Sequence, residues 1–175
     1  MKLYHASQTE IREPDIHLGR KNADFGPGFY LTPDLDFARR WAGDGAVLNE
    51  YELDETGLKI RRFTRSEDWF RCIFENRRLK DSLTADVVIG PIANDTIFET
   101  MGIISSGYLS PQEAMKLLMI GPEFTQAAVK TQKAADQLRW IRADRILKQE
   151  EASRKAEQEE YQAEFARVME EIAGE

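Results

Sequence analysis

The chain has only one cysteine and two histidines, and acidic residues outnumber basic ones. A single cysteine cannot form an intramolecular disulfide, and Cys72 has apolar neighbours, so we expect a core residue rather than a catalytic thiol. Two histidines and no second cysteine give no spacing typical of a metal site. The net charge of −7 argues against a basic face that holds DNA or RNA electrostatically.

Long apolar runs are missing as well. No stretch approaches the roughly 20 apolar residues that span a bilayer, and the N-terminus lacks a secretory-signal pattern. These absences predict no membrane association and a cytoplasmic protein. The apolar share of 42% is close to the norm for globular proteins, and 175 residues are enough to bury a substantial core.

The composition changes near residue 143. From residue 148 to the end there are nine acidic and four basic residues, a net charge of −5. Four apolar residues in this segment recur at helical spacing, namely Tyr161, Phe165, Val168 and Ile172. We therefore predict a first domain over 1–143 and an acidic amphipathic helix over 144–175. Either the helix folds back on its own domain, or it binds a partner or a second copy of the chain.

Short strands and helices alternate before this helix without a regular period, which predicts an α+β fold rather than a doubly wound sheet. Helices should begin after the capping residues Thr32, Ser66, Ser110 and Thr131. Strands are expected over 2–6, 28–31, 46–53, 85–92 and 123–131.

The most informative block covers residues 20–42. Gly26 and Gly28 flank a proline directly before an aromatic strand, where the backbone can turn tightly and approach a ligand. Tyr30 in that strand offers a flat ring for stacking on a planar cation. His5, on the first strand, can donate to a ribose hydroxyl from one nitrogen while the protein holds the other. Each feature also has a purely structural interpretation. The glycines form a plain turn, Tyr30 is a half-buried strand residue, and His5 is a core histidine.

Several motifs resemble those of ADP-ribosyltransferases of the diphtheria-toxin and poly(ADP-ribose)-polymerase type. Residues 3–7, Leu-Tyr-His-Ala-Ser, resemble their His-Gly-Ser or His-Gly-Thr strand. Residues 25–32 resemble their Phe-Gly-x-Gly-aromatic-Tyr strand, and residues 35–42 resemble the helix that follows it. The resemblance is closer still to a bacterial family in that superfamily, through Asp-Phe-Gly-x-Gly-Phe-Tyr at 24–30, Ile-Gly-Pro-Ile-Ala-Asn-Asp at 89–95 and Gln-x-x-x-x-Thr-x-x-Ala at 126–134. It covers residues 2 to about 142.

The resemblance implies a split antiparallel sheet with flanking helices, and a site that takes NAD as a substrate. Tyr30 would stack on the nicotinamide ring, and His5 would bond a ribose. The backbone of Ala6 would hold the carboxamide, while Ser7 and Arg20 would reach hydroxyls or the diphosphate. Gly28 would belong to the same cofactor-binding turn. From its chemistry alone, Arg20 suits either a phosphate or a surface ion pair.

Gln126 fills the position at which such transferases usually carry a catalytic glutamate on a late strand. A glutamine can bond the ribose hydroxyl but brings no negative charge to stabilise the reacting sugar. Glu123 is the only acid on the predicted strand, and alternation places it on the opposite face. The implied catalytic set is therefore His5, Tyr30 and Gln126.

Asn94 and Asp95 follow a buried strand, where they either orient the acceptor or cap their own turn.

Three functions remain open at this stage. The protein is an ADP-ribosyltransferase acting on a protein or nucleic-acid acceptor, an NAD-binding module without turnover, or an interaction protein whose C-terminal helix binds a partner. Relatives of the resembling family are thought to include toxins of toxin–antitoxin pairs, so an antitoxin is one expected partner.

Overall fold

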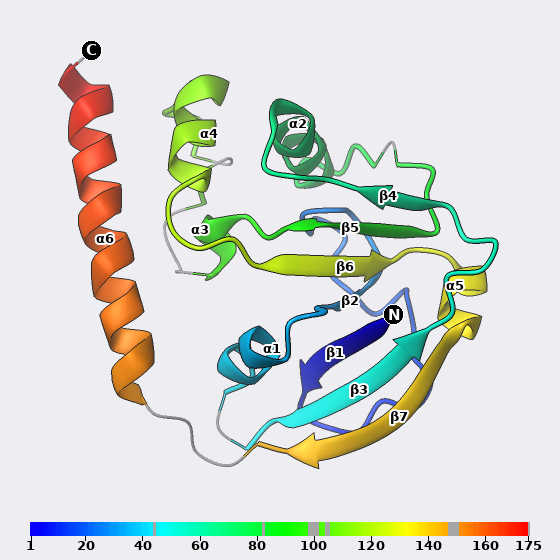
Figure 1. Ribbon diagram of the computed structural model, residues 1–175. Helices are drawn as coiled ribbons and strands as arrows, with labels where there is room; N and C mark the ends of the chain where they lie inside the picture. Colours follow the sequence, from blue (N-terminus) through cyan, green and yellow to red (C-terminus); the bar gives the residue numbers. More distant parts are fainter. Residues whose placement is uncertain (44, 82, 98–101, 104–105, 147–150, 175) are drawn as a thin grey trace. The chain divides into compact units, whose positions relative to one another are not determined.

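The computed structural model describes residues 1–43, 45–81, 83–97, 102–103, 106–146 and 151–174 (Figure 1). Within them the fold is α+β, with two sheets and six helices, as the sequence predicts. The chain forms two compact units, each described here by itself. The first contains Met1–Pro91 and Phe124–Gln149, and the second contains Ile92–Glu123 and Glu150–Glu175.

The first unit contains both sheets. One sheet has the antiparallel order β1 (Lys2–Ser7), β3 (Val47–Leu53), β7 (Leu138–Arg145), and Figure 1 shows these strands side by side. The other has the order β2 (Phe29–Leu31), β6 (Thr125–Val129), β5 (Val87–Pro91), β4 (Ile60–Arg62). The strands pair antiparallel except at one edge, where β4 and β5 run parallel.

A common core joins the two sheets. Leu3, Tyr51 and Leu53 from the first sheet belong to the same buried cluster as Val87 and Val129 from the second. A single bridge also links the sheets, because Tyr4 and Thr32 exchange backbone hydrogen bonds of 2.8 and 2.9 Å. Burial of apolar side chains on both inner faces therefore fixes β2 between β1 and β6.

Helices α1 (Leu35–Trp41), α2 (Glu67–Asn76) and α5 (Gln132–Asp136) also belong to the first unit. Ser66 and Thr131 cap α2 and α5 as predicted. The cap of α1 was predicted wrongly: Asp34 accepts from the Phe37 N–H at 2.9 Å. Thr32 makes a tertiary contact instead: its hydroxyl donates a hydrogen bond to the Thr125 carbonyl at 2.7 Å.

The second unit contains α3 (Asn94–Ile97), α4 (Pro111–Leu118) and α6 (Glu151–Gly174). The predicted Ser110–Glu113 capping box opens α4. The helix predicted over 144–175 corresponds to α6, but its predicted start is wrong, because Asp144 and Arg145 belong to β7. Residues 147–150 and 175 lie outside the described part of the chain. Because α6 contacts α4 and Tyr161 is 2% exposed, the helix packs against its own chain.

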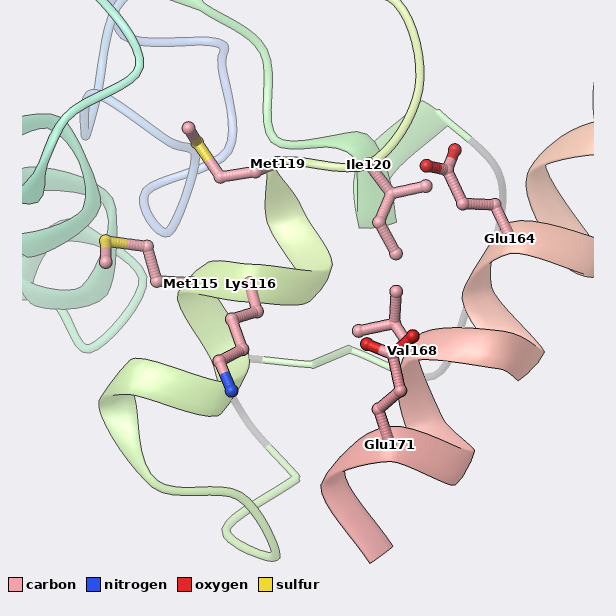
Figure 2. A pocket seen from close by; sticks show the side chains of 7 residues that line it. All are labelled: Met115, Lys116, Met119, Ile120, Glu164, Val168 and Glu171. Carbon is pink, nitrogen blue, oxygen red and sulfur yellow. The ribbon is translucent and has the colours of Figure 1, made fainter. Parts of the chain in front are cut away.

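A hollow lies between α4 and α6 (Figure 2). Ile120 and Val168 point toward each other across it, and the carboxylates of Glu164 and Glu171 flank Val168 on α6. The hollow thus has an apolar centre bordered by charges of both signs, from Glu164, Glu171 and Lys116.

Two strands were not anticipated. β4 is only three residues long, and β7 alternates poorly because arginines recur along it. Ion pairs bind these arginines to the neighbouring strand: Arg142 contacts Glu50 at 2.9 Å. The sequence pattern of β7 does not predict a strand. The segment forms one because it pairs with β3 in the folded protein.

No helix among the described residues is both long and apolar enough to cross a membrane.

The core predicts a sharp contrast between two leucines. Leu3 is fully buried in the cluster between the sheets, whereas Leu18 is 85% exposed. Leu3→Ala should lower the free energy of unfolding by about 2–5 kcal/mol, since it leaves a cavity. Leu18→Ala, the matched control, should change it by less than about 0.5 kcal/mol. Urea denaturation followed by tryptophan fluorescence measures both, and equal effects would contradict the assigned core.

Candidate functional site

His5 lies on β1 and contacts the neighbouring strand β2. Its Nδ1 is 2.6 Å from the Tyr30 backbone carbonyl oxygen, and its ring packs against Phe29 with centroids 4.4 Å apart. A carbonyl can only accept a hydrogen bond, so Nδ1 must carry the hydrogen. In the neutral ring, Nε2 is then an acceptor, and it bonds to nothing among the described residues.

The surroundings keep this ring neutral. Burial lowers the pKa of His5 below its ordinary value of 6.5, and the bond to the Tyr30 carbonyl opposes that effect only in part. The sequence-based expectation was that His5 donates to a ribose hydroxyl. The geometry reverses the direction of that bond, because at neutral pH Nε2 offers a lone pair and not a proton.

Tyr30 is held by the turn that precedes its own strand. Its hydroxyl donates to the Gly26 carbonyl at 2.7 Å and accepts from the Phe25 N–H at 2.9 Å. Burial raises the pKa of the Tyr30 hydroxyl, so it stays protonated and keeps donating. The ring is half-buried and fixed at both ends, by its strand and by its hydroxyl.

Both predicted glycines are required by packing. Gly26 has a φ of +77°, which favours glycine, and a Cβ there would lie 2.8 Å from the Asn76 side-chain oxygen. A Cβ on Gly28 would lie 2.7 Å from the Val129 carbonyl oxygen. The absence of a side chain at Gly28 therefore lets the turn approach strand β6 closely.

Gln126 shares a sheet face with Tyr30. Tyr30 pairs with Ala128 across β2 and β6, and Gln126 lies two residues from Ala128, so all three side chains point to the same side. Glu123 does not lie on this strand, contrary to the prediction, because β6 begins at Thr125. Gln126 is therefore the polar side chain that β6 presents beside Tyr30.

The amide of Gln126 is buried and oriented. Its Nε2 donates to Asp24 Oδ2 at 2.9 Å and to the Pro91 carbonyl at 3.4 Å. Asp24 is 4% exposed, and its Oδ1 accepts from Arg77 Nε and Nη2 at 2.9 and 2.6 Å. The segment from Asp24 to Gly26 thus contacts both Gln126 and Tyr30.

The remaining predicted cofactor residues differ in their surroundings. The Ser7 hydroxyl donates to the Thr9 carbonyl and accepts from Asn49 Nδ2 at 3.1 Å, so it holds the loop after β1. Ala6 pairs with Leu48 in the sheet, and its contact with a carboxamide stays a prediction. Arg20 is exposed and makes no ion pair with any described residue. The surface ion pair considered for Arg20 is therefore absent from that part of the chain.

Asn94 and Asp95 belong to the second unit. Asn94 is fully buried, and its amide donates to the Ile120 carbonyl, which ties α3 to the chain after α4. Asp95 is also buried and accepts from the Thr96 hydroxyl at 3.4 Å. Asn94 therefore has a structural contact of its own, and the role of both residues toward an acceptor stays a prediction.

Sequence reasoning missed three residues that organise this region. Asp24 orients Gln126, Arg77 holds Asp24, and the fully buried Asn49 joins Ser7 to the loop over 9–11. Asp24 gave a signal, because it directly precedes the glycine block. Arg77 gave none, since it follows α2 and lies 53 positions from its partner.

The cysteine behaves as predicted. Cys72 is buried on α2, and burial raises the pKa of its thiol to about 12, which keeps it a thiol at neutral pH. The described residues contain no cluster of three or more histidine, cysteine or acidic side chains that could hold a metal ion.

Comparison with known proteins places the chain in a family. Residues 1–140 match the model described as Protein of unknown function (DUF3990), and the chain belongs to this family. The match includes His5, Tyr30 and Gln126 and ends before α6. No curated protein and no solved structure matches the chain.

The close approach at Gly28 gives a stability prediction. Gly28→Ala should destabilise the protein by more than about 1 kcal/mol, because the new methyl group would push β6 away from the turn. Gly43→Ala is the matched control, since a Cβ there meets nothing within 4 Å. Thermal denaturation of both variants tests this, and a stable Gly28→Ala protein would contradict the geometry.

The neutral state of His5 gives a pH prediction. Its pKa is lower in the folded protein, so the unfolded chain takes up a proton first as the pH falls below 6.5. This contribution to stability is thus complete above that pH and is lost in more acidic solution.

The His5→Asn variant should lose less stability than the wild type between about pH 7.5 and about pH 5.5. Urea denaturation at both pH values measures the difference. His17→Gln, at an exposed position, is the control. An identical pH dependence in wild type and His5→Asn would refute a depressed pKa at His5.

Proposed function

We propose that this protein is an NAD-dependent ADP-ribosyltransferase with an ADP-ribosyltransferase-like split sheet. The motif resemblance over residues 2–142 supports the proposal. So does one observation, that two acceptor atoms, His5 Nε2 and Gln126 Oε1, have no partner among the described residues. They belong to strands on either side of β2, which carries Tyr30. Gln126 lies on the face of Tyr30, whereas the His5 ring packs against Phe29, the preceding residue of β2. A ligand with several hydroxyl donors and a planar ring could use these groups.

NAD has these features. Its riboses donate hydroxyl hydrogen bonds, and its cationic nicotinamide ring can stack on a tyrosine. Neutral His5 would accept from one ribose hydroxyl, and Gln126 would accept from the 2′-hydroxyl of the nicotinamide ribose. An arginine such as Arg20 suits the diphosphate.

In the proposed reaction, the bond between ribose C1′ and nicotinamide N1 breaks, and its electron pair leaves with nicotinamide. Positive charge develops on the ribose. The Gln126 oxygen, which would accept a hydrogen bond from the 2′-hydroxyl, favours that charge. A nucleophile of the macromolecular acceptor then attacks C1′ and loses its proton to solvent. Where water takes that place, the product is free ADP-ribose.

The biological role follows the same resemblance. We propose a toxin-like enzyme that acts in the cytoplasm on a protein or nucleic acid, with an antitoxin as one partner. The net charge of −7 favours local recognition of the acceptor over a broad electrostatic grip.

The hollow between α4 and α6 favours a second candidate. It combines the apolar Ile120 and Val168 with charged side chains of both signs at its border (Figure 2). The second candidate is a protein-interaction module. It would bind NAD at the candidate site without turnover, and it would bind a partner through α6. Tight NAD binding without nicotinamide release would support this second function.

Nicotinamide release from NAD tests the primary proposal. The purified protein should release nicotinamide, with or without added bacterial lysate as a source of acceptor. His5→Ala, Tyr30→Ala and Gln126→Ala should each lower the rate by roughly 100-fold, because each removes a group that would touch the ribose or the ring.

Tyr108→Ala is the matched control for Tyr30→Ala, because Tyr108 is 94% exposed. It should leave the rate unchanged. Absence of both NAD binding and nicotinamide release in the wild type would refute the proposal.

A further inference from the structure

A glutamine amide can present either end to a ligand. Its NH₂ donates and its oxygen accepts, and only its neighbours decide which end faces where. A glutamate at the same place offers acceptors in every orientation. If Gln126 is to accept from a ribose hydroxyl, the protein must therefore prevent its amide from turning over.

The two neighbours of the amide meet this requirement. Asp24 Oδ2 lies 2.9 Å from Gln126 Nε2, and the Pro91 carbonyl lies 3.4 Å from the same nitrogen. Both neighbours are acceptors, so only the NH₂ end can face them. Turning the amide over would set its oxygen against the Asp24 carboxylate in a buried place, which is electrostatically unfavourable.

The Asp24 carboxylate is itself oriented. Arg77 donates to Oδ1 through Nε and Nη2, and Gln126 donates to Oδ2. The Arg77 side chain is 16% exposed and supplies the countercharge for a carboxylate that is almost fully buried. In the order Arg77–Asp24–Gln126, both outer side chains donate charge-assisted hydrogen bonds to the central carboxylate.

We propose that Asp24 is a positioning residue that fixes the orientation of the Gln126 amide. The amide oxygen then accepts a hydrogen bond from the ribose hydroxyl, as a glutamate oxygen would. The inference rests on the proposed transferase function. It explains why position 126 carries no acid: a glutamate there would place a second carboxylate against Asp24 Oδ2, where two like charges repel each other.

The geometry defines a charge-conserving swap. In Asp24→Asn/Gln126→Glu, the asparagine oxygen accepts from Arg77, and its NH₂ donates to the glutamate. Net charge is unchanged, and the direction of the bond between positions 24 and 126 is reversed. The longer bond from position 126 to the Pro91 carbonyl is lost in the swap. The other carboxylate oxygen of the glutamate remains an acceptor for the ribose.

The experiment measures nicotinamide release from NAD by the wild type, the two single variants and the double variant. Asp24→Asn should lower kcat by roughly 10- to 100-fold with KM for NAD nearly unchanged, because the amide then turns freely. Gln126→Glu should also lose activity. The double variant should have a clearly higher kcat than either single variant.

Asp81→Asn is the control. Asp81 is a nearby carboxylate that bonds Lys130 at 2.9 Å and does not touch Gln126. It should leave kcat unchanged. Thermal denaturation of every variant identifies loss of fold, and the double variant keeps the test decisive if Asp24→Asn does not fold.

Wild-type kcat in either single variant would overturn the inference, and so would a folded double variant as inactive as the singles. A wild-type protein that releases no nicotinamide would overturn the proposed function and this inference together. The two failures are distinguishable, since one appears in the wild type and the other only in the variants.

Discussion

The buried carboxylate of Asp24 is the contact on which the candidate site depends. It joins three parts of the first unit: the loop before β2, the end of α2 through Arg77, and β6 through Gln126. A carboxylate that is 4% exposed is stable only when it is paired and fully hydrogen-bonded. The loop, the helix and the strand must therefore adopt their positions together, and Tyr30 is fixed by the same loop through its hydroxyl.

The site that results is built from neutral acceptors. Burial keeps His5 neutral with its hydrogen on Nδ1, and Gln126 has its NH₂ directed to protein acceptors. Both side chains thus offer lone pairs to a ligand that donates. The charge of the region stays within the protein, where Arg77 neutralises Asp24.

Much of the fold could be predicted from local signals. The capping residues Ser66, Ser110 and Thr131 begin helices as expected, because a cap satisfies backbone donors within a few residues. Strand β7 and the cap of α1 could not be predicted this way. Their outcome depends on partners far along the chain, since β7 pairs with β3 and the Thr32 hydroxyl donates to Thr125.

The sequence by itself determined which residue types are present at the site: His5, the glycine turn, Tyr30 and Gln126, in an order that resembles an NAD-using family. Only the tertiary structure decided how they act. The Tyr30 carbonyl sets the tautomer of His5, and Asp24 sets the direction of the Gln126 amide. The physical reason is that a hydrogen bond has a direction, and this direction depends on neighbours that are distant in sequence and adjacent only after folding.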